Sequence, residues 1–580
     1  MTAHKSVTTT IAPSVQHSLT SLYRGLPPSS WGILAACFLL LGVMSLSGSK
    51  KGKLARGRFG GKREKENAKR VALTQMRERR HNAVPIWVGT PSNLPFGPSP
   101  IYLPDAQRGT IVIGAPGSGK TASVIDQAAY SVIEQGHPIL MWDFKYPTQT
   151  SRIAGYAHLC GYNVHVIAPG KDESATLNPI KEFLTSEHDS LMARQFSEVL
   201  NANFKRSGHT TEDSYFASAG DQALEGLLML ARGSKYPDIM MAQALSSVTD
   251  LANLLIAHKD KVNPWIMSSF GQLIASAKSE KTVASILGTA NLNLTRLIKS
   301  DLLPALCGDT TVPTFLEGKQ LLILGLDREK RDVISPLIAT ILHLLIARNV
   351  TRPRKSPLFF IADELPTLFL PALVHWLNEN REDGLCSILG FQNIVQMEKL
   401  YGRELARAIL GACATKIIFN PQDYDSAKLF SSYIGETEIR YKTRSSGSSA
   451  GKGSTNTAEH VQVRSLMTPD DLLHLPTGRG VIINPSQQHQ KDAYIPILES
   501  IPLSREYKAK IKKSTRQWDK LRKELIAKNV KSQITDSDLR RRYEEADRLL
   551  PPLPKAGATT RRRMPIEEFL DDPASPLYST

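Results

Sequence analysis

The stretch Gly114-Ala115-Pro116-Gly117-Ser118-Gly119-Lys120-Thr121 has the form G-x-x-x-x-G-K-T. An apolar run precedes it, and apolar residues at helical spacing follow it to about Gln135. This is the strand–loop–helix context of a phosphate-binding loop, whose glycines let backbone N–H groups approach an anion. All eight residues are predicted to bind a nucleotide, with Lys120 on the β- and γ-phosphates and Thr121 on Mg²⁺. The alternative is a Gly-rich turn in an unrelated α/β fold.

A second short stretch supplies two carboxylates. The apolar run from Pro357 to Ala362 is followed by Asp363 and Glu364. A buried parallel strand has such a continuous apolar sequence, and ligands bind beyond the carboxyl ends of parallel strands. Asp363 is predicted to order Mg²⁺ through water, and Glu364 to polarise the attacking water, as in a hydrolase. A strand that ends in a solvated acidic turn is the alternative.

Length and charge set limits on the rest of the chain. With 580 residues the chain is too long for one core, so two or three domains are expected. It has 72 Lys and Arg against 55 Asp and Glu, a net charge of +17. This excess suits a polyanion or an anionic membrane surface and does not choose between them. The five cysteines have neither disulfide-framework nor zinc-site spacing.

Residues 31–47 are apolar and uncharged, and a dense run of Lys and Arg follows them. About 17 residues are at the lower limit for a membrane-spanning helix. Because positive charge stays on the cytoplasmic side, we expect a single-pass membrane protein with its bulk in the cytoplasm. A buried core helix and a signal peptide are the alternatives.

The order of apolar runs predicts an α/β fold. Strands alternate with helices up to residue 167, the strand pattern is absent from about residue 186 to 316, and strands resume at residue 321. This pattern indicates a mostly parallel sheet interrupted by an all-helical insertion. The expected organisation is a short external N-terminus (1–30), a transmembrane helix (31–47), a basic juxtamembrane segment (48–83), two parts of a nucleotide-binding domain (84–183 and 318–503), an all-helical domain (184–317) and a charged C-terminal tail (504–580).

Two later segments lack an apolar pattern. Residues 443–457 are rich in Gly, Ser and Thr and are predicted to be a mobile loop. The charged segment after residue 504 contains helical stretches, but we expect it to be disordered or partner-binding rather than part of a core.

The order of these motifs resembles that of the type IV coupling proteins of conjugation and type IV secretion, the TraG/TraD type. The likeness covers roughly residues 105–500. Besides the two stretches above, it rests on Trp142-Asp143-Phe144-Lys145, Thr176-Leu177-Asn178-Pro179-Ile180, Asn380-Arg381-Glu382-Asp383-Gly384, Gly390-Phe391-Gln392-Asn393, Tyr401-Gly402, Ile434-Gly435-Glu436 and Met467-Thr468-Pro469-Asp470-Asp471-Leu472.

The resemblance implies a RecA-like ATPase that uses ATP and Mg²⁺ and assembles as a homo-oligomeric ring, expected to be a hexamer. Arg381 matches a position proposed as an arginine finger on the neighbouring subunit's nucleotide, and Gln392 matches a position thought to sense the γ-phosphate. A surface salt bridge of Arg381 and a turn-stabilising amide of Gln392 are the alternatives. Family members commonly have two membrane helices, whereas this sequence contains one candidate.

The function implied is that of a membrane-anchored motor. It would drive DNA, single-stranded with an attached relaxase or other cargo protein, into a channel whose inner-membrane scaffold is a further partner. The alternatives are a receptor ATPase for effector proteins, a chromosome-pumping motor on duplex DNA, and a structural subunit that binds ATP without turnover. The presence of both Asp363 and Glu364 argues against the last.

Overall fold

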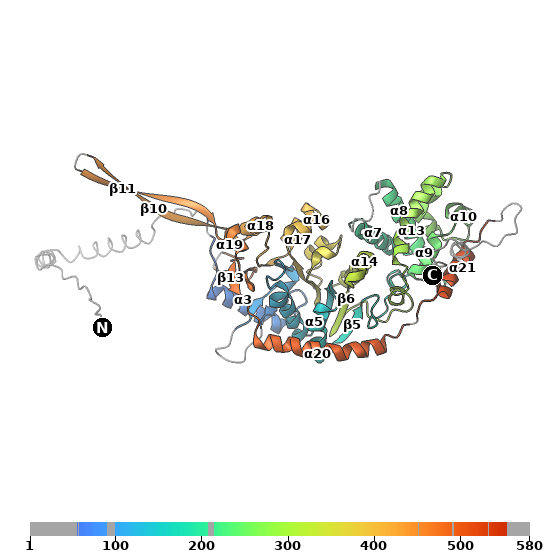
Figure 1. The fold of residues 1–580 in the computed structure, drawn as a ribbon, viewed down its shortest axis with the longest axis horizontal. Helices are drawn as coiled ribbons and strands as arrows, with labels where there is room; N and C mark the ends of the chain where they lie inside the picture. The colour runs from blue at the N-terminus through green and yellow to red at the C-terminus, as the bar shows by residue number, and fades with distance from the viewer. Residues whose placement is uncertain are drawn as a thin grey trace, which may run out of the picture. The chain divides into compact units, whose positions relative to one another are not determined.

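A computed structural model describes residue 55 and residues 57–89, 99–206, 214–449, 452–489, 492–531 and 533–553. Its centre is a nine-stranded sheet in the order β13-β12-β9-β3-β8-β7-β4-β6-β5 (Figure 1). The strands are β3 (Thr110–Ile113), β4 (Ile139–Asp143), β5 (Asn163–Ile167), β6 (Gln320–Gly325), β7 (Leu358–Ala362), β8 (Leu385–Phe391), β9 (Thr415–Ile418), β12 (Arg479–Ile483) and β13 (Ile497–Ser500).

Every neighbouring pair from β9 to β5 is parallel, and β12 pairs antiparallel with both β9 and β13. The prediction of a mostly parallel sheet is therefore confirmed. Strand β8 lies between β3 and β7. The carboxyl ends of these three strands consequently meet at one edge of the sheet, where β3 leads into the glycine-rich loop.

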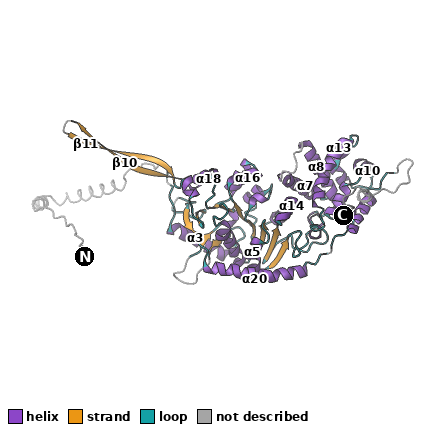
Figure 2. Cartoon of the chain, in the orientation of Figure 1, coloured by secondary structure: helices purple, strands orange, loops and turns teal. Residues whose placement is uncertain are grey.

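Both faces of the sheet are covered. Ile111 and Ile113 belong to one apolar core and Val112 to another, as the alternation of side chains along a strand requires. The covering helices include α4 (Asp126–Gln135), with the π-helical turn η2 (Lys120–Ile125) before it, α5 (Thr148–Leu159), α14 (Arg331–Val350), α15 (Leu373–Asn378), α16 (Ile394–Tyr401), α17 (Arg403–Ala412), α18 (Tyr424–Ile434) and α19 (Pro469–Leu473) (Figure 2).

Between β5 and β6 the described residues contain helices and no strand. These are α6 (Pro179–Phe183), α7 (Ser190–Arg206), α8 (Ser214–Gly233), α9 (Ile239–Ser246), α10 (Leu251–Ala257), α11 (Pro264–Ser269), α12 (Gly271–Ala275), α13 (Glu280–Leu297) and η3 (Leu303–Ala305). The helices and the sheet share one apolar core and one compact unit.

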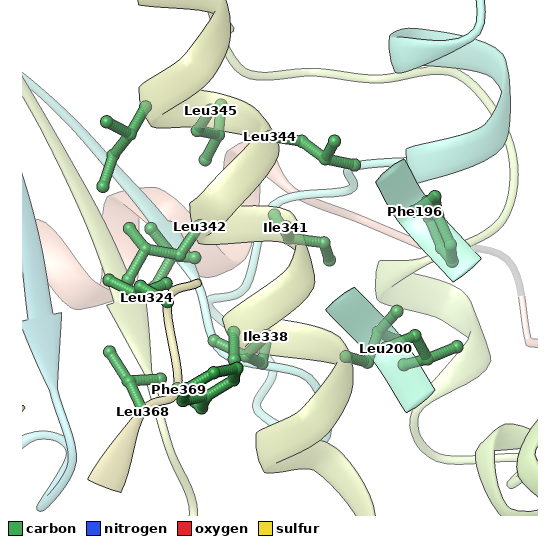
Figure 3. Packing of buried hydrophobic residues seen from close by; sticks show 14 of the residues in the cluster. Phe196, Leu200, Leu324, Ile338, Ile341, Leu342, Leu344, Leu345, Leu368 and Phe369 are labelled. Atoms are coloured by element: carbon green, nitrogen blue, oxygen red, sulfur yellow. The ribbon is translucent and has the colours of Figure 1, made fainter. Parts of the chain in front are cut away.

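Helix α14 joins the sheet to the helical part. Its residues Ile338 and Ile341 lie between Leu200 of α7 on one side and Leu324 of β6 on the other (Figure 3). Within the described part of the chain, Arg328–Val350 is the one unbroken helix long and apolar enough to cross a membrane, and 78% of its most apolar window is buried in the protein. A bent pair, α9 with α10, passes the same test only if it counts as one span. We therefore assign α14 to the core. The predicted span 31–47 lies outside the described residues.

The N-terminal part of the described chain lies beside the sheet. It consists of helix α3 (Lys62–Glu78), the antiparallel strands β1 (Ile86–Val88) and β2 (Ile101–Leu103), and the short helix η1 (Ala106–Arg108). Short 3₁₀ turns also occur at η4 (Arg328–Lys330) and η5 (Leu365–Thr367). Gln75 of α3 donates a hydrogen bond to Asp105, which fixes the helix to the segment that leads into β3.

The predicted mobile loop 443–457 is wrong. Strands β10 (Glu436–Ser449) and β11 (Lys452–Ser465) form a separate two-stranded sheet. Residues 437–464 belong to a different compact unit from residues 57–436 and those after residue 464. Strands buried on one face alternate apolar and polar residues, and this pair buries neither face at its described, exposed positions 440–444 and 457–464. Apolar residues alternate with polar ones at Ile439, Tyr441, Val461 and Val463, but residues 443–457 are mostly Gly, Ser and Thr and lack this pattern.

The prediction that the chain after residue 504 is a tail outside the core is also wrong for residues 505–550. Helix α20 (Arg505–Lys528) packs along α5 with Tyr507, Trp518, Leu521 and Leu525 buried. Helix α21 (Asp536–Leu549) packs on α9, where Arg542 forms a buried ion pair of 2.6 Å with Asp238. The many charged residues between the buried positions masked an apolar stripe of helical spacing.

The contact between α20 and α5 is unusually close at Gly155. A Cβ atom at this position would lie 2.0 Å from the carbonyl oxygen of Ser514. The Ser514 hydroxyl accepts a hydrogen bond from the Tyr156 N–H (2.9 Å) and donates one to the Ser151 carbonyl (3.1 Å). The two backbones can approach this closely because Gly155 has no side chain.

This contact predicts opposite effects for two helical glycines. Gly288, in α13, has no atom within 4 Å of the position that a Cβ would take. Gly288→Ala should raise the free energy of unfolding by up to about 1 kcal/mol, the helix-propensity gain. Gly155→Ala should lower it by about 1–3 kcal/mol, the usual cost of overpacking. The midpoint of urea unfolding measures both, and a stabilising Gly155→Ala would contradict the packing.

Candidate functional site

The glycine-rich loop leaves β3 and is fixed by the ends of two neighbouring strands. The N–H of Gly114 donates to the carbonyl of Phe391, which ends β8, and the N–H of Ala115 donates to the carbonyl of Asn420, just past β9. Gly117 and Gly119 have φ angles of +80° and +100°, which side-chain-bearing residues rarely adopt. The loop therefore keeps the shape that aims its N–H groups and the start of the following helix at an anion.

Lys120 lies at the centre of the site. Its Nζ donates to the backbone carbonyl of Asp363 (2.9 Å) and lies 3.5 Å from Asp363 Oδ1 and 3.6 Å from Glu364 Oε2. The Thr121 hydroxyl donates to Asp363 Oδ2 (2.6 Å). The lysine is 7% exposed, so its charge is largely removed from water and depends on these oxygens. The two halves predicted from the sequence thus meet in one site.

Glu364 is held from its other side by Gln392. Gln392 follows β8, and its Nε2 donates to Glu364 Oε2 at 2.9 Å. Burial raises the pKa of the Glu364 carboxyl above its ordinary value, while the Lys120 charge and the Gln392 hydrogen bond oppose that rise. A buried, oriented carboxylate with a raised pKa suits a group that accepts a proton or polarises water.

The residues present fit a magnesium ion. Asp363 Oδ1 is buried and has no hydrogen-bond partner, and the Thr121 hydroxyl lies on the other oxygen of the same carboxylate. Mg²⁺ prefers oxygen ligands and takes few of them from the protein when phosphates supply the rest. The described residues contain no cluster of three or more His, Cys, Asp or Glu that could hold a metal, and a site of this kind needs none.

Arg381 is not part of this constellation. It lies in the turn before β8, is exposed, and makes no hydrogen bond or ion pair with any described residue, Glu382 and Asp383 included. Gln392 lies at the other end of the same strand, and the seven residues of β8 span roughly 23 Å. Arg381 therefore lies at the opposite edge of the sheet from Lys120 of its own chain.

Two contacts around the loop were not anticipated. The Thr477 hydroxyl donates to the Gly117 carbonyl (3.1 Å), and the Gly478 N–H donates to the Ser118 carbonyl (2.9 Å). A Cβ at Gly119 would lie 3.1 Å from the Gly478 nitrogen. The sequence signal for this contact was position, because Thr477 comes five residues after the Met467–Leu472 motif.

The helix after the loop carries a second unanticipated group. Asp126, in α4, is fully buried, pairs with Arg152 of α5 at 2.9 Å and accepts a hydrogen bond from Gln149 at 3.0 Å. Burial raises the pKa of Asp126 to about 6. Asp143, at the end of β4, accepts hydrogen bonds from the N–H groups of Gln149 and Thr150 and so caps α5. The sequence signal for a buried Asp126 was an acidic residue inside an otherwise apolar helix.

Comparison with known proteins identifies similar proteins that are named as coupling proteins. The family model for the type IV secretion-system coupling protein DNA-binding domain matches residues 94–490. The coupling protein TraD of Escherichia coli (strain K12) is 30% identical over 149 residues, which are 25% of this chain and 20% of TraD. The matched region thus spans about a fifth of that relative's length.

Solved structures of the bacterial conjugative coupling protein TrwB share the fold. The unbound form TrwBdeltaN70 superimposes with a TM-score of 0.51 at 15% identity, covering 74% of this chain and 91% of the solved TrwBdeltaN70 chain. A complex of TrwB with ADP and Mg²⁺ gives 0.50 at 16% identity, covering 69% and 86%. At these identities the likeness establishes the fold alone.

Replacement of Lys120 tests the phosphate-binding assignment. Lys120→Met should weaken the binding of magnesium ATP by about 10- to 100-fold, since a hydrogen bond from a charged group contributes about 1.5–3 kcal/mol. The exposed Lys145, at the end of β4, gives the matched control Lys145→Met, which should bind as the parent does. Titration calorimetry measures both, and equal affinities for the two variants would contradict the assignment.

Proposed function

The chain belongs to the type IV secretion-system coupling protein family, and we propose that it is an ATPase that moves DNA into a conjugative or type IV secretion channel. The observation that carries this proposal is the meeting of Lys120 with Asp363 and Glu364 at the end of the phosphate-binding loop. TraD carries the name coupling protein, and TrwB structures contain ADP with Mg²⁺ or a non-hydrolysable ATP analogue.

Each residue of the site has a role in this proposal. The loop N–H groups and Lys120 hold the phosphates, while Thr121 and Asp363 would hold Mg²⁺. The ion, when bound, neutralises charge on the phosphate oxygens. Glu364 accepts a hydrogen bond from the attacking water, and Gln392 fixes the orientation of the Glu364 carboxylate. The loop contacts of Thr477 and Gly478 position the backbone N–H groups.

The cargo and setting follow from charge and family. A net charge of +17 suits a polyanionic cargo. We favour single-stranded DNA, carried with a relaxase or another cargo protein, and an anchor in the inner membrane next to a channel scaffold. A ring, expected to be a hexamer, brings a neighbouring subunit to each nucleotide site. Arg381 is remote from Lys120 of its own chain, so in such a ring it would act on the nucleotide bound by the neighbouring subunit.

The rate of ATP hydrolysis with and without DNA tests the proposal. The full chain in detergent should hydrolyse ATP faster with single-stranded DNA than without it, and single strands should stimulate more than duplex. Glu364→Gln should lower the rate by about 10²- to 10⁴-fold, the usual contribution of a proton-accepting group, and should still bind nucleotide.

The outcomes separate the candidate functions. Stimulation by duplex alone would favour a duplex motor, and stimulation by a secreted protein without DNA would favour an effector receptor. Absence of hydrolysis under all conditions would overturn the proposed activity.

Arg381 is predicted to act on the nucleotide of the adjacent subunit. Arg381→Ala should lower turnover by about 10³-fold with unchanged nucleotide affinity, because its guanidinium would stabilise charge in the transition state. Glu382→Ala, in the same exposed turn, is the control and should retain activity. Mixing inactive Lys120→Ala and Arg381→Ala subunits should restore part of the activity, and mixtures that stay inactive would contradict a role across the interface.

Gln392 is predicted to set the pH dependence of hydrolysis. The Glu364 carboxyl works only when deprotonated, so the rate should fall as the pH drops through its raised pKa. Gln392→Leu removes a hydrogen bond that lowers this pKa. The acid limb should then move to higher pH by about one unit, since a hydrogen bond of about 1.4 kcal/mol corresponds to one pKa unit.

The control for this pH profile lies nearby. Gln396→Leu, at an exposed position of α16, should leave the acid limb unchanged. An unshifted limb in Gln392→Leu would show that its amide does not act on the ionisation of Glu364.

A further inference from the structure

The outward face of α20 carries a row of positive charges without partners. Its members are exposed, and none of their side chains makes a hydrogen bond or ion pair with a described residue; they are Lys508, Lys512, Lys513, Arg516, Lys520 and Lys523. Two cations on the flanks behave differently. Lys510 pairs with Glu134 at 2.5 Å and Arg522 with Glu173 at 3.0 Å. The fold therefore uses the flanking charges for its own stability and leaves the outward row free.

The row is held in a fixed arrangement. The opposite face of α20 is buried on α5, and α20 runs along the surface of the sheet-covering helices (Figure 1). Lys508, Lys512, Arg516 and Lys520 follow each other at four-residue intervals, so neighbours on this line are roughly 6 Å apart along the helix axis. The line from Lys508 to Lys520 is roughly 18 Å long, which matches about five phosphates along one strand of B-DNA.

The row also borders a hollow in the surface. Lys512, Lys513, Arg516 and Lys520 line it together with Leu159 at the end of α5. Three carboxylates, Glu506, Asp519 and Glu524, are also exposed on this helix, against ten Lys and Arg in its 24 residues. The side chains thus form an open, concave and strongly basic surface, which is the electrostatic character of a groove that follows a nucleic-acid backbone.

We propose that this face of α20 binds the phosphate backbone of the transported DNA, at a surface separate from the nucleotide site. The inference rests on the proposed function for the identity of the cargo. It goes beyond the family domain, because α20 begins at Arg505 and the family model ends at residue 490. Contacts to phosphates are independent of sequence, as a transport protein requires.

A lipid surface is a less suitable occupant. Helices that lie on membranes insert their apolar face between the lipid headgroups. In α20 that face is occupied by α5, with Tyr507, Trp518, Leu521 and Leu525 buried. Only charge would remain to attract lipid, whereas charge alone is sufficient for binding to a phosphate backbone.

Removal of the charges around the hollow tests the proposal. In the full chain, Lys512, Lys513, Arg516 and Lys520 are changed together to Gln, which keeps helix propensity. The control replaces the three lysines by Arg and so keeps every charge. ATP hydrolysis without DNA should be unchanged in both variants, because these residues do not touch the nucleotide site.

The affinity for a single-stranded oligonucleotide is then measured as a function of salt. The Gln variant should bind at least about 10-fold more weakly at 0.1 M salt, and its slope of log affinity against log salt should be shallower by about 3, from about 0.7 per lost contact. The Arg variant should match the parent. An unchanged slope in the Gln variant overturns the proposal but leaves the DNA motor intact, whereas absence of DNA binding by the parent overturns both.

Lysine acetylation of the full chain in lipid nanodiscs separates DNA from lipid as the occupant. DNA should protect Lys512, Lys513 and Lys520 from the reagent in neutral and anionic nanodiscs alike. Protection by anionic lipid, with no further protection by DNA, would assign the face to the membrane and overturn the proposal.

Discussion

The ammonium group of Lys120 connects two segments of the chain, because it donates a hydrogen bond to the carbonyl of Asp363, 243 residues further along the sequence. A buried charge is costly unless it is paired, so the loop after β3 is stable in this form only when the end of β7 is beside it. Strand β8 fixes that spacing because it pairs with β3 on one side and β7 on the other. The same strand delivers Gln392 to Glu364. The site is thus a consequence of strand order at one edge of the sheet.

Contacts from the site continue toward the helical part of the protein. Asp126, on the helix that begins at Lys120, pairs with Arg152 of α5, and α5 in turn packs along α20. After α20 the chain reaches α21, whose Arg542 pairs with Asp238 at the start of α9. The C-terminal helices therefore bridge the nucleotide-binding sheet and the helical insertion. This arrangement gives the proposed motor a covalent connection between them that lies outside the region matched by the family model.

The strength of local sequence signals explains which elements were predictable. Most strands of the parallel sheet are continuous apolar runs because they are buried on both faces. The predicted end of the first strands at residue 167, their resumption at residue 321 and the run 357–362 correspond to the end of β5, the start of β6 and β7. In the hairpin of β10 and β11 the alternation of apolar and polar residues is limited to residues 438–442 and 460–464, and the Gly-, Ser- and Thr-rich residues 443–457 lack it. Helix α20 does have an apolar stripe, but its charged residues dominate the composition and led to the prediction of a tail. In both cases, composition was a poor guide to whether the backbone is ordered.

The sequence by itself determined the chemistry of the site, because a phosphate-binding loop and an acidic strand end are local patterns that require particular residues at fixed spacing. It also determined the family. The tertiary structure alone decided that Lys120 is enclosed by Asp363 and Glu364, that Arg381 lies at the far edge of the sheet, and that Thr477 and Gly478 support the loop. It also decided that a row of lysines on α20 is free while its neighbours are paired. These features depend on strand order and on contacts between remote segments, and no local pattern of residues encodes such contacts.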